Sequence, residues 1–285
     1  ILLRKGIMDF NVMIGVVAPF LGTVLGSAMV FLLKKDFPEI VEKALLGFAG
    51  GVMMAASVFS LLLPSIEQAD NDGNIGWMIA SLGFLGGIVF LLLLDVVIPH
   101  VHVNSDEEEG IKTSWTKTTK LFLAMTLHNI PEGMALGIVF ASIVDQSVAM
   151  STGAAFALAL GIAIQNIPEG AVLSMPLHQA GMSRFKAFLY GSASGIVEPI
   201  GAIITIFASH LIRPLLPWLL AFAAGAMVYC VVEELIPSSQ HGKHSNIGTI
   251  LFTLGFVCIS VSFILSCFHN TQNHYCCNTE TIGSK

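Results

Sequence analysis

Two related hexapeptides place imidazole, amide and carboxylate groups inside long apolar stretches. The copies, 37 positions apart, are His128-Asn129-Ile130-Pro131-Glu132-Gly133 and Gln165-Asn166-Ile167-Pro168-Glu169-Gly170. Residues three and four apart share a helix face, so each glutamate lies near the first two residues of its motif. An imidazole nitrogen together with carboxylate and amide oxygens suits divalent ions such as Zn²⁺ or Fe²⁺. A pair of such helices could therefore hold two adjacent cations, with the glutamates bridging them.

The proline and glycine of each motif fit the same purpose. A proline has no N–H to donate, so the carbonyls of Leu127 and Ile164 become available at membrane depth. Gly133 and Gly170 allow neighbouring helices to approach closely. Pro199 frees a carbonyl beside Glu198 in the same way.

Composition indicates an integral membrane protein. The 285 residues are 54% hydrophobic and 11% charged, with a mean hydropathy of +0.80, whereas soluble domains carry about 25% charged residues. Lys and Arg are scarce and scattered, which argues against nucleic-acid binding. The five cysteines form no disulfide or zinc-finger pattern, and Cys230, Cys258 and Cys267 are expected to pack as small hydrophobes.

The chain contains eight apolar runs, each long enough for a membrane span of about 20 residues. They predict an all-α polytopic protein with eight transmembrane helices in a single domain, 1–285, with a cytosolic loop at 99–116 and a tail at 269–285. The predicted spans are residues 7–33, 44–66, 75–98, 117–143, 150–177, 186–212, 215–237 and 246–268.

A weak internal repeat relates the two ends of the chain. The matching segments are Ser81–Phe84 with Thr253–Phe256, Gly51–Met53 with Gly225–Met227, and Leu63–Ser65 with Ile236–Ser238. Spans 1–3 (7–98) thus pair with spans 6–8 (186–268), around central spans 4–5 (117–177). Each span lies five spans away from its partner, so the two copies cross the membrane in opposite directions and form a 3+2+3 inverted repeat. Transporters often bind substrate at the membrane midplane, where two inverted repeats meet. Met53 and Met227, at matching positions, are expected to pack, with a gate-lining role as the alternative.

Loop charges predict the orientation. Nine Lys and Arg residues lie in links on one side and four on the other. The positive-inside rule therefore places both termini outside the cytosol, in the plasma membrane or an organelle membrane.

Polar residues from three spans reach one depth. His128, Gln165 and Glu198 each lie 11 or 12 residues from a predicted cytosolic end, roughly 17–18 Å deep at about 1.5 Å per residue. Placing a glutamate inside the membrane costs roughly 2.5 kcal/mol of free energy or more. Glu132, Glu169 and Glu198 have no Lys or Arg beside them in the spans, so they require bound cations or protons. The predicted metal ligands are His128, Asn129, Glu132, Gln165, Asn166, Glu169 and Glu198.

A second group of residues could form a cytosolic exit. The candidates are Asp95, Glu234, His100 and His102. Asp95 and Glu234 fall within the last turn or so of their apolar runs, whereas the two histidines lie in the following link. The alternative is that each is a solvated loop residue, as expected for the charge run Asp106–Glu109.

The paired motifs in spans 4 and 5 of eight resemble the ZIP (Zrt/Irt-like) family of divalent metal transporters. Gln165 and the stretch from Asp95 to His102 are similar to its GufA-like branch. The resemblance covers nearly the whole chain and implies zinc uptake toward the cytosol, sometimes with iron or manganese, by a homodimer. It also implies one site from His128, Glu132, Gln165 and Glu169 and another from Asn129, Glu132, Asn166, Glu169 and Glu198. Some relatives carry a carboxylate where this chain has Asn166. The amide gives the second site of this chain less negative charge than it has in those relatives.

Two other functions are compatible with the same residues. Carboxylate-bridged metal pairs also catalyse hydrolysis and oxidation, but the chain has no His-Glu-x-x-His motif and no dense histidine cluster. The glutamates could instead bind protons or sodium in a carrier or channel for another cation. We therefore predict a transporter and not an enzyme, with the metal as substrate and no catalytic cofactor.

Overall fold

The described part of the chain is built from helices. The computed structural model describes residues 10–32, 38–101, 109–144 and 152–269. Seven helical segments there are long and apolar enough to cross a membrane. α6 has 28 residues but is not among the seven, and it carries His128 and Glu132 in its middle. The all-α, multi-pass class is confirmed, while the eighth span remains a prediction.

Most helices follow one another with short connections, and a longer link, residues 98–116, joins α5 to α6. Their bounds are α1 Phe10–Ser27, α2 Met29–Leu32, α3 Glu39–Ala55, α4 Leu63–Asn71, α5 Gly76–Val97, α6 Lys117–Val144, α7 Thr152–Gln179, α8 Arg184–Ser194, α9 Val197–Ile212, α10 Leu216–Cys230, α11 Ile236–Gln240 and α12 Ile247–His269. Two π-helical segments, η2 (Ala56–Leu62) and η4 (Val231–Leu235), and a 3₁₀ turn, η3 (Arg213–Leu215), join neighbouring helices.

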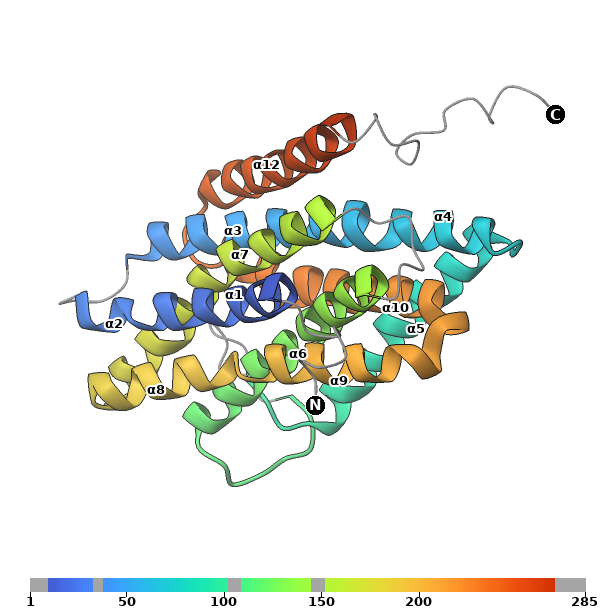
Figure 1. Ribbon diagram of the computed structural model, residues 1–285. Coiled ribbons are helices and arrows are strands. Elements are labelled where there is room, and N and C mark those ends of the chain that lie inside the picture. Colours follow the sequence, from blue (N-terminus) through green and yellow to red (C-terminus); the bar gives the residue numbers. More distant parts are fainter. Residues whose placement is uncertain (1–9, 33–37, 102–108, 145–151, 270–285) are drawn as a thin grey trace.

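α6 and α7 cross the middle of the bundle and carry the two hexapeptides (Figure 1). α7 packs mainly on α1, and α6 packs mainly on α9. A Cβ atom at Gly170 would collide with the backbone of Thr23, and one at Gly133 with the backbone of Glu198. The expected role of these glycines in close helix approach is confirmed.

The outer helices pack in equivalent pairs. α3 lies along α12, and α10 lies along α5. A Cβ at Gly51 would meet the backbone of Phe252, and one at Gly225 would meet that of Phe84. Each of the two π-helical segments ends just before a proline, Pro64 or Pro237, which cannot complete the regular hydrogen-bond ladder. The inverted repeat remains our interpretation of the sequence, and these paired features support it.

Several helices extend beyond the predicted spans. α3 begins at Glu39 rather than at residue 44, and α4 and α11 run to Asn71 and Gln240. Lys43, expected in a link, is buried inside α3. Its ammonium group pairs with Glu39 at 2.8 Å and donates to the Lys243 carbonyl at 2.6 Å. Counting apolar residues missed these turns because charged side chains stabilise them locally.

The sixth predicted span consists of two helices. α8 ends at Ser194 and α9 begins at Val197. Gly195 caps α8, and Pro199 lies in the first turn of α9, where a missing N–H costs nothing. Glu198 thereby enters the first turn of α9, where the helix dipole favours a carboxylate.

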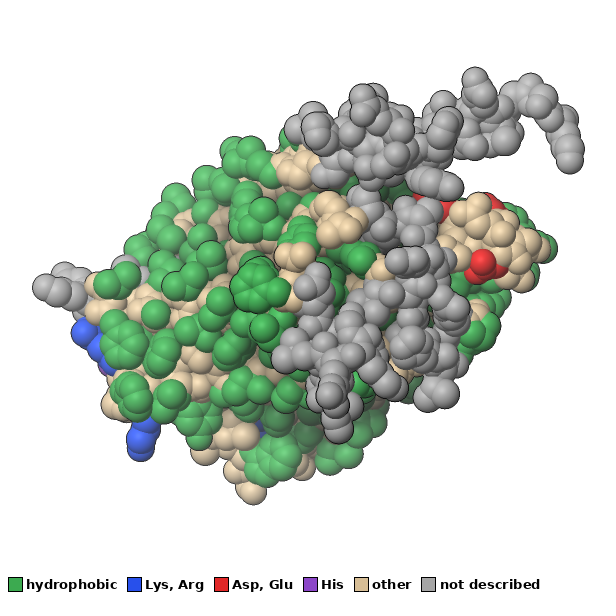
Figure 2. Space-filling view, in the orientation of Figure 1, with side chains coloured by type: hydrophobic (Ala, Val, Ile, Leu, Met, Phe, Trp, Pro, Cys, Tyr) green, Lys and Arg blue, Asp and Glu red, His purple; other side chains and the backbone are tan. Residues whose placement is uncertain are grey.

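Charges gather at opposite ends of the molecule. Figure 2 shows a face that is mostly hydrophobic, with Lys and Arg near the start of α8 and Asp and Glu near the end of α4. Arg184 and Lys186 begin α8, and Asp70 and Asp72 lie at the end of α4. The apolar band between them is the surface that a bilayer would cover.

Candidate metal centre

The predicted ligands meet where α6, α7 and α9 come together. Asn129 and Glu132 from α6, the three α7 ligands and Glu198 from α9 are all buried. His128 is the most exposed of the set, with 14% of its side-chain surface accessible. The helices continue through Pro131 and Pro168, so each motif keeps the face predicted from its spacing.

One hydrogen bond joins the two hexapeptides directly. The Gln165 amide donates from Nε2 to Oε1 of Glu132 at 2.7 Å. Glu132 Oε2 and Gln165 Oε1 have no hydrogen-bond partner in the described structure. The bond thus fixes one oxygen of the glutamate and leaves two acceptor oxygens beside it.

A second polar group ties α1 to the centre. Asn166 donates from Nδ2 to Glu198 Oε2 at 2.8 Å and to the Pro19 carbonyl at 3.1 Å. The Thr23 hydroxyl donates to Glu198 Oε1 at 3.3 Å. Each oxygen of Glu198 therefore already accepts a hydrogen bond. We call Thr23, Asn166 and Glu198 the latch; Thr23 was missed from the sequence because a lone threonine in an apolar helix gives no signal.

Asn129 links α6 to α8. Its Nδ2 donates to the Ser194 carbonyl, in the last turn of α8, at 3.0 Å. That carbonyl lies where the helix stops and would otherwise lack a donor. The Asn129 Oδ1 atom remains unpartnered among the described residues.

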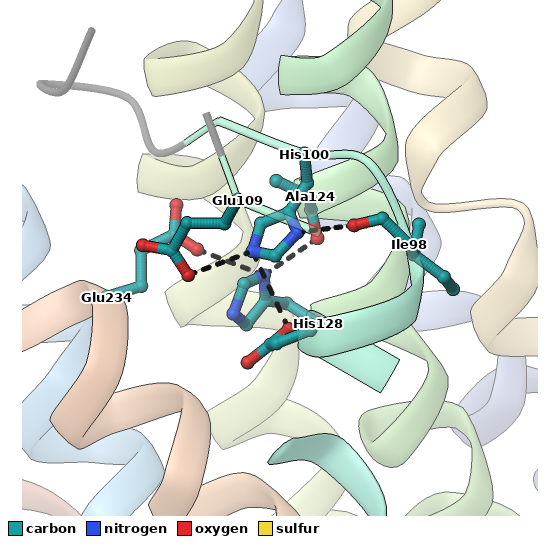
Figure 3. Close-up of polar contacts among 7 residues, drawn as sticks. Ile98, His100, Glu109, Ala124, His128 and Glu234 are labelled. Carbon is teal, nitrogen blue, oxygen red and sulfur yellow. Dashed lines mark hydrogen bonds and ion pairs between the residues drawn. The ribbon is translucent and has the colours of Figure 1, made fainter. Parts of the chain in front are cut away.

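The His128 ring lies beside two of the predicted exit residues, His100 and Glu234 (Figure 3). Its Nδ1 lies 2.7 Å from the Ala124 carbonyl and 3.0 Å from Glu234 Oε2. A carbonyl can only accept, so Nδ1 carries the hydrogen and the neutral ring has its lone pair on Nε2. That tautomer suits a metal ligand, because ligating imidazoles donate their other N–H to a carbonyl or carboxylate.

Two predicted exit residues lie together beyond His128. His100 is buried, and its Nε2 is 3.6 Å from Asp95 and 3.8 Å from Glu109 (Figure 3). Its Nδ1 lies 2.8 Å from the Ile98 carbonyl. Glu109, which the sequence assigned to a solvated charge run, thus pairs with a buried histidine. His102 lies outside the described residues.

Glu234 occupies an unexpected position in its helix. It lies in the π-helical segment η4, and the helix continues as α11 to Gln240. The carboxylate is 3% exposed and turns inward toward His128. The span predicted from the sequence ended at residue 237, before the end of the helix. The helix continues because Ser238 and Ser239, although polar, are buried within it.

A cavity opens on the His128 side of the centre. Its polar lining comes from His128, Glu169 and Glu234, and its remaining lining from Met53, Met125, Cys230 and Leu235. Glu169 Oε2 has no hydrogen-bond partner in the described structure. Met53 and Met227 are both fully buried, and of the two only Met53 lines this cavity.

The unpartnered atoms of the centre share one chemical character. Each is an acceptor oxygen from an amide or a carboxylate, and the set comprises Asn129 Oδ1, Glu132 Oε2, Gln165 Oε1, Asn166 Oδ1 and Glu169 Oε2. Buried acceptors without donors are costly unless a cation or proton meets them. Among the described residues, no three His, Cys, Asp or Glu side chains already stand in a metal-ligating arrangement, so binding requires side-chain rotation.

Comparison with known proteins adds an independent finding. Residues 102–264 match the family model described as ZIP Zinc transporter. The chain is 31% identical to Zinc transporter ZIP11 of Homo sapiens, over 87% of this chain and 95% of the relative. It is 36% identical to Zinc transporter GufA of Myxococcus xanthus, over 85% of this chain and 95% of the relative. It is 32% identical to Zinc transporter ZupT of Chlorobium phaeovibrioides, over 79% and 86% of the two chains.

Proposed function

The chain belongs to the ZIP zinc transporter family, and we propose that it carries Zn²⁺ across a membrane into the cytosol through the centre between α6 and α7. Iron and manganese are the other candidate substrates, as the resemblance implies. Its relatives are named as zinc transporters, a role that is not enzymatic.

The observation that carries the proposal is the set of unpartnered acceptor oxygens at the centre. Five such atoms come from the two hexapeptides, and the chain has no Lys or Arg between Lys120 and Arg184. A membrane interior offers no water to satisfy them. A divalent cation that exchanges its hydration shell for these oxygens supplies the missing charge and the missing partner together.

We assign the substrate to the first ligand set: His128 Nε2, Glu132, Gln165 Oε1 and Glu169. Nitrogen and oxygen ligands of this kind suit Zn²⁺. Glu198 belongs to the latch, because Thr23 and Asn166 already donate to its two oxygens. A second cation at Asn129, Asn166 and Glu198 requires the Asn166 amide to release Glu198, so we propose that this site fills only after the first.

The polar residues beyond His128 give a route for release. His128 contacts Glu234, and Asp95, His100 and Glu109 lie near one another at the end of α5. Protonation of His128 would weaken its bond to a cation and strengthen its pairing with Glu234. We propose that the leaving cation passes to these carboxylates, with His102 as a further candidate ligand.

The packing supports movement of two bodies past each other. α1 packs on α7 and α6 packs on α9, whereas α3 packs on α12 and α10 packs on α5. Rocking of the first group against the second would expose the centre to each side in turn. We further propose a homodimer with both termini outside the cytosol, from the family resemblance and the loop charges respectively.

Uptake of radiolabelled zinc into sealed proteoliposomes tests the function. We expect zinc to accumulate inside, with competition by Fe²⁺ and Mn²⁺ that ranks the substrates. The controls are vesicles without protein and vesicles that contain the Glu132→Ala variant. Zinc that binds to the protein but does not enter the vesicles would contradict transport and favour a metalloenzyme.

A further inference from the structure

We propose that the cavity beside the two hexapeptides is a binding site for soft divalent cations in which Cys230 supplies a sulfur ligand from outside those motifs. The biological consequence, discrimination among transported ions, rests on the proposed transport function. The site itself is defined by the residues around the cavity and can be tested without transport.

Three sulfur atoms come to the cavity from three helices. Cys230 ends α10 and is 1% exposed, Met53 comes from α3, and Met125 comes from α6. Each of them alone is more often a packing residue, and a buried cysteine usually behaves as a small hydrophobe. Their common cavity is what distinguishes them from the exposed Cys258 on α12.

A second observation points to a ligand in the same cavity. Glu169 is 6% exposed, and its Oε2 atom, which has no hydrogen-bond partner among the described residues, belongs to a side chain that lines the cavity. His128 and Glu234 line it as well and contact each other (Figure 3). A cation there would meet sulfur from one group of residues and nitrogen or oxygen from the other.

This mixture of ligands selects by softness. Thiolate and thioether sulfur favour soft and borderline ions, whereas Mn²⁺ prefers carboxylate, carbonyl and water oxygens. Cd²⁺, a soft divalent ion, is therefore the probe of choice, and Mn²⁺ is the hard control. On binding, the Cys230 S–H bond breaks and a sulfur–cadmium bond forms; the proton passes to the buffer, and no electron is transferred.

The first experiment measures binding alone. A variant keeps Cys230 as its single cysteine and carries serine at Cys258, Cys267, Cys276 and Cys277. In detergent, Cd²⁺ should produce the ultraviolet charge-transfer absorption of a cadmium–thiolate bond, and Mn²⁺ should produce none. A folded single-cysteine protein without that absorption overturns the proposal, whether or not zinc is transported.

The second experiment measures selectivity. Zinc uptake into proteoliposomes is competed with Cd²⁺ or Mn²⁺ in the wild type, in Cys230→Ala and Cys230→Ser, and in the matched control Cys258→Ala. Because a ligand is lost, the Cd²⁺ concentration that halves zinc uptake should rise about tenfold or more in the Cys230 variants. The corresponding Mn²⁺ concentration should not change in them, and neither concentration should change in Cys258→Ala. Equal Cd²⁺ competition in a Cys230 variant and the wild type overturns the proposal. Absence of zinc uptake in the wild type instead contradicts the proposed function, and the absorption measurement still decides the role of Cys230.

Discussion

The two sides of the central polar layer use similar residues in opposite ways. On the cavity side, Glu169 has an oxygen that no donor among the described residues reaches, and its side chain lines the cavity together with His128. On the latch side, both oxygens of Glu198 accept hydrogen bonds, from Thr23 and Asn166. Burial does not separate the two glutamates, since both are buried among the central helices. The available donors separate them, because a carboxylate that lacks donors attracts a cation and one that has them ties helices together.

The largest effect is expected at Glu132, which contacts the opposite hexapeptide. Glu132→Ala removes the Gln165 partner and a central negative charge, so zinc uptake should fall by on the order of 100-fold or more. Glu132→Gln keeps an oxygen for the Gln165 amide and removes only the charge, and it should fold as the wild type does. Uptake of radiolabelled zinc, with detergent size-exclusion profiles for folding, measures both variants.

Glu67→Gln is the control for this change, because Glu67 is exposed in the middle of α4. It should transport zinc at the wild-type rate. Wild-type uptake by folded Glu132→Ala would remove Glu132 from the site.

A smaller loss of affinity is expected on the cavity side at Glu169. Glu169→Gln keeps the shape of the side chain and removes its charge, so the zinc concentration for half-maximal uptake should rise about 10- to 100-fold. Glu198→Gln, the same change on the latch side, should raise it much less. Equal shifts in the two variants would show that the latch contributes a ligand as the cavity side does.

The sequence predicted an all-α, multi-pass membrane protein, which is confirmed, and it missed features for identifiable physical reasons, while the metal site remains a prediction. The two hexapeptides were recognisable because carboxylates and amides are rare in apolar helices. The break at Gly195 and the two π-helical segments were missed because they leave the apolar run continuous. Thr23 carries no charge, Cys230 reads as a hydrophobe, and only packing brings either of them to the centre.

Asn166 offers a way to convert the latch into a ligand set. Asn166→Asp removes the donor to Glu198 and sets two carboxylates side by side, which favours a bound cation. At zinc concentrations that only just fill the first site of the wild type, equilibrium dialysis in detergent should find one zinc ion per wild-type chain and part of a second ion per variant chain. Two ions in the wild type would mean that the latch opens readily, and one ion in the variant would mean that Glu198 cannot serve as a ligand.

The smallest effect is expected at Thr23, and it tests whether the latch serves structure. Thr23→Val keeps the shape of the side chain and removes the donor to Glu198 Oε1. The loss of one donor to a buried carboxylate should lower the free energy of unfolding by about 1–3 kcal/mol, seen as a lower melting temperature in detergent. Thr253→Val is the matched control, because the Thr253 hydroxyl is exposed and bonds only within α12. Zinc uptake by Thr23→Val should stay within about twofold of the wild type, since the cavity side keeps all of its ligands. If Thr23→Val is as stable as the wild type but has lost zinc uptake, Glu198 is a ligand of the transport site. The Thr23 hydroxyl would then orient that ligand, and it would not serve to join α1 to α9.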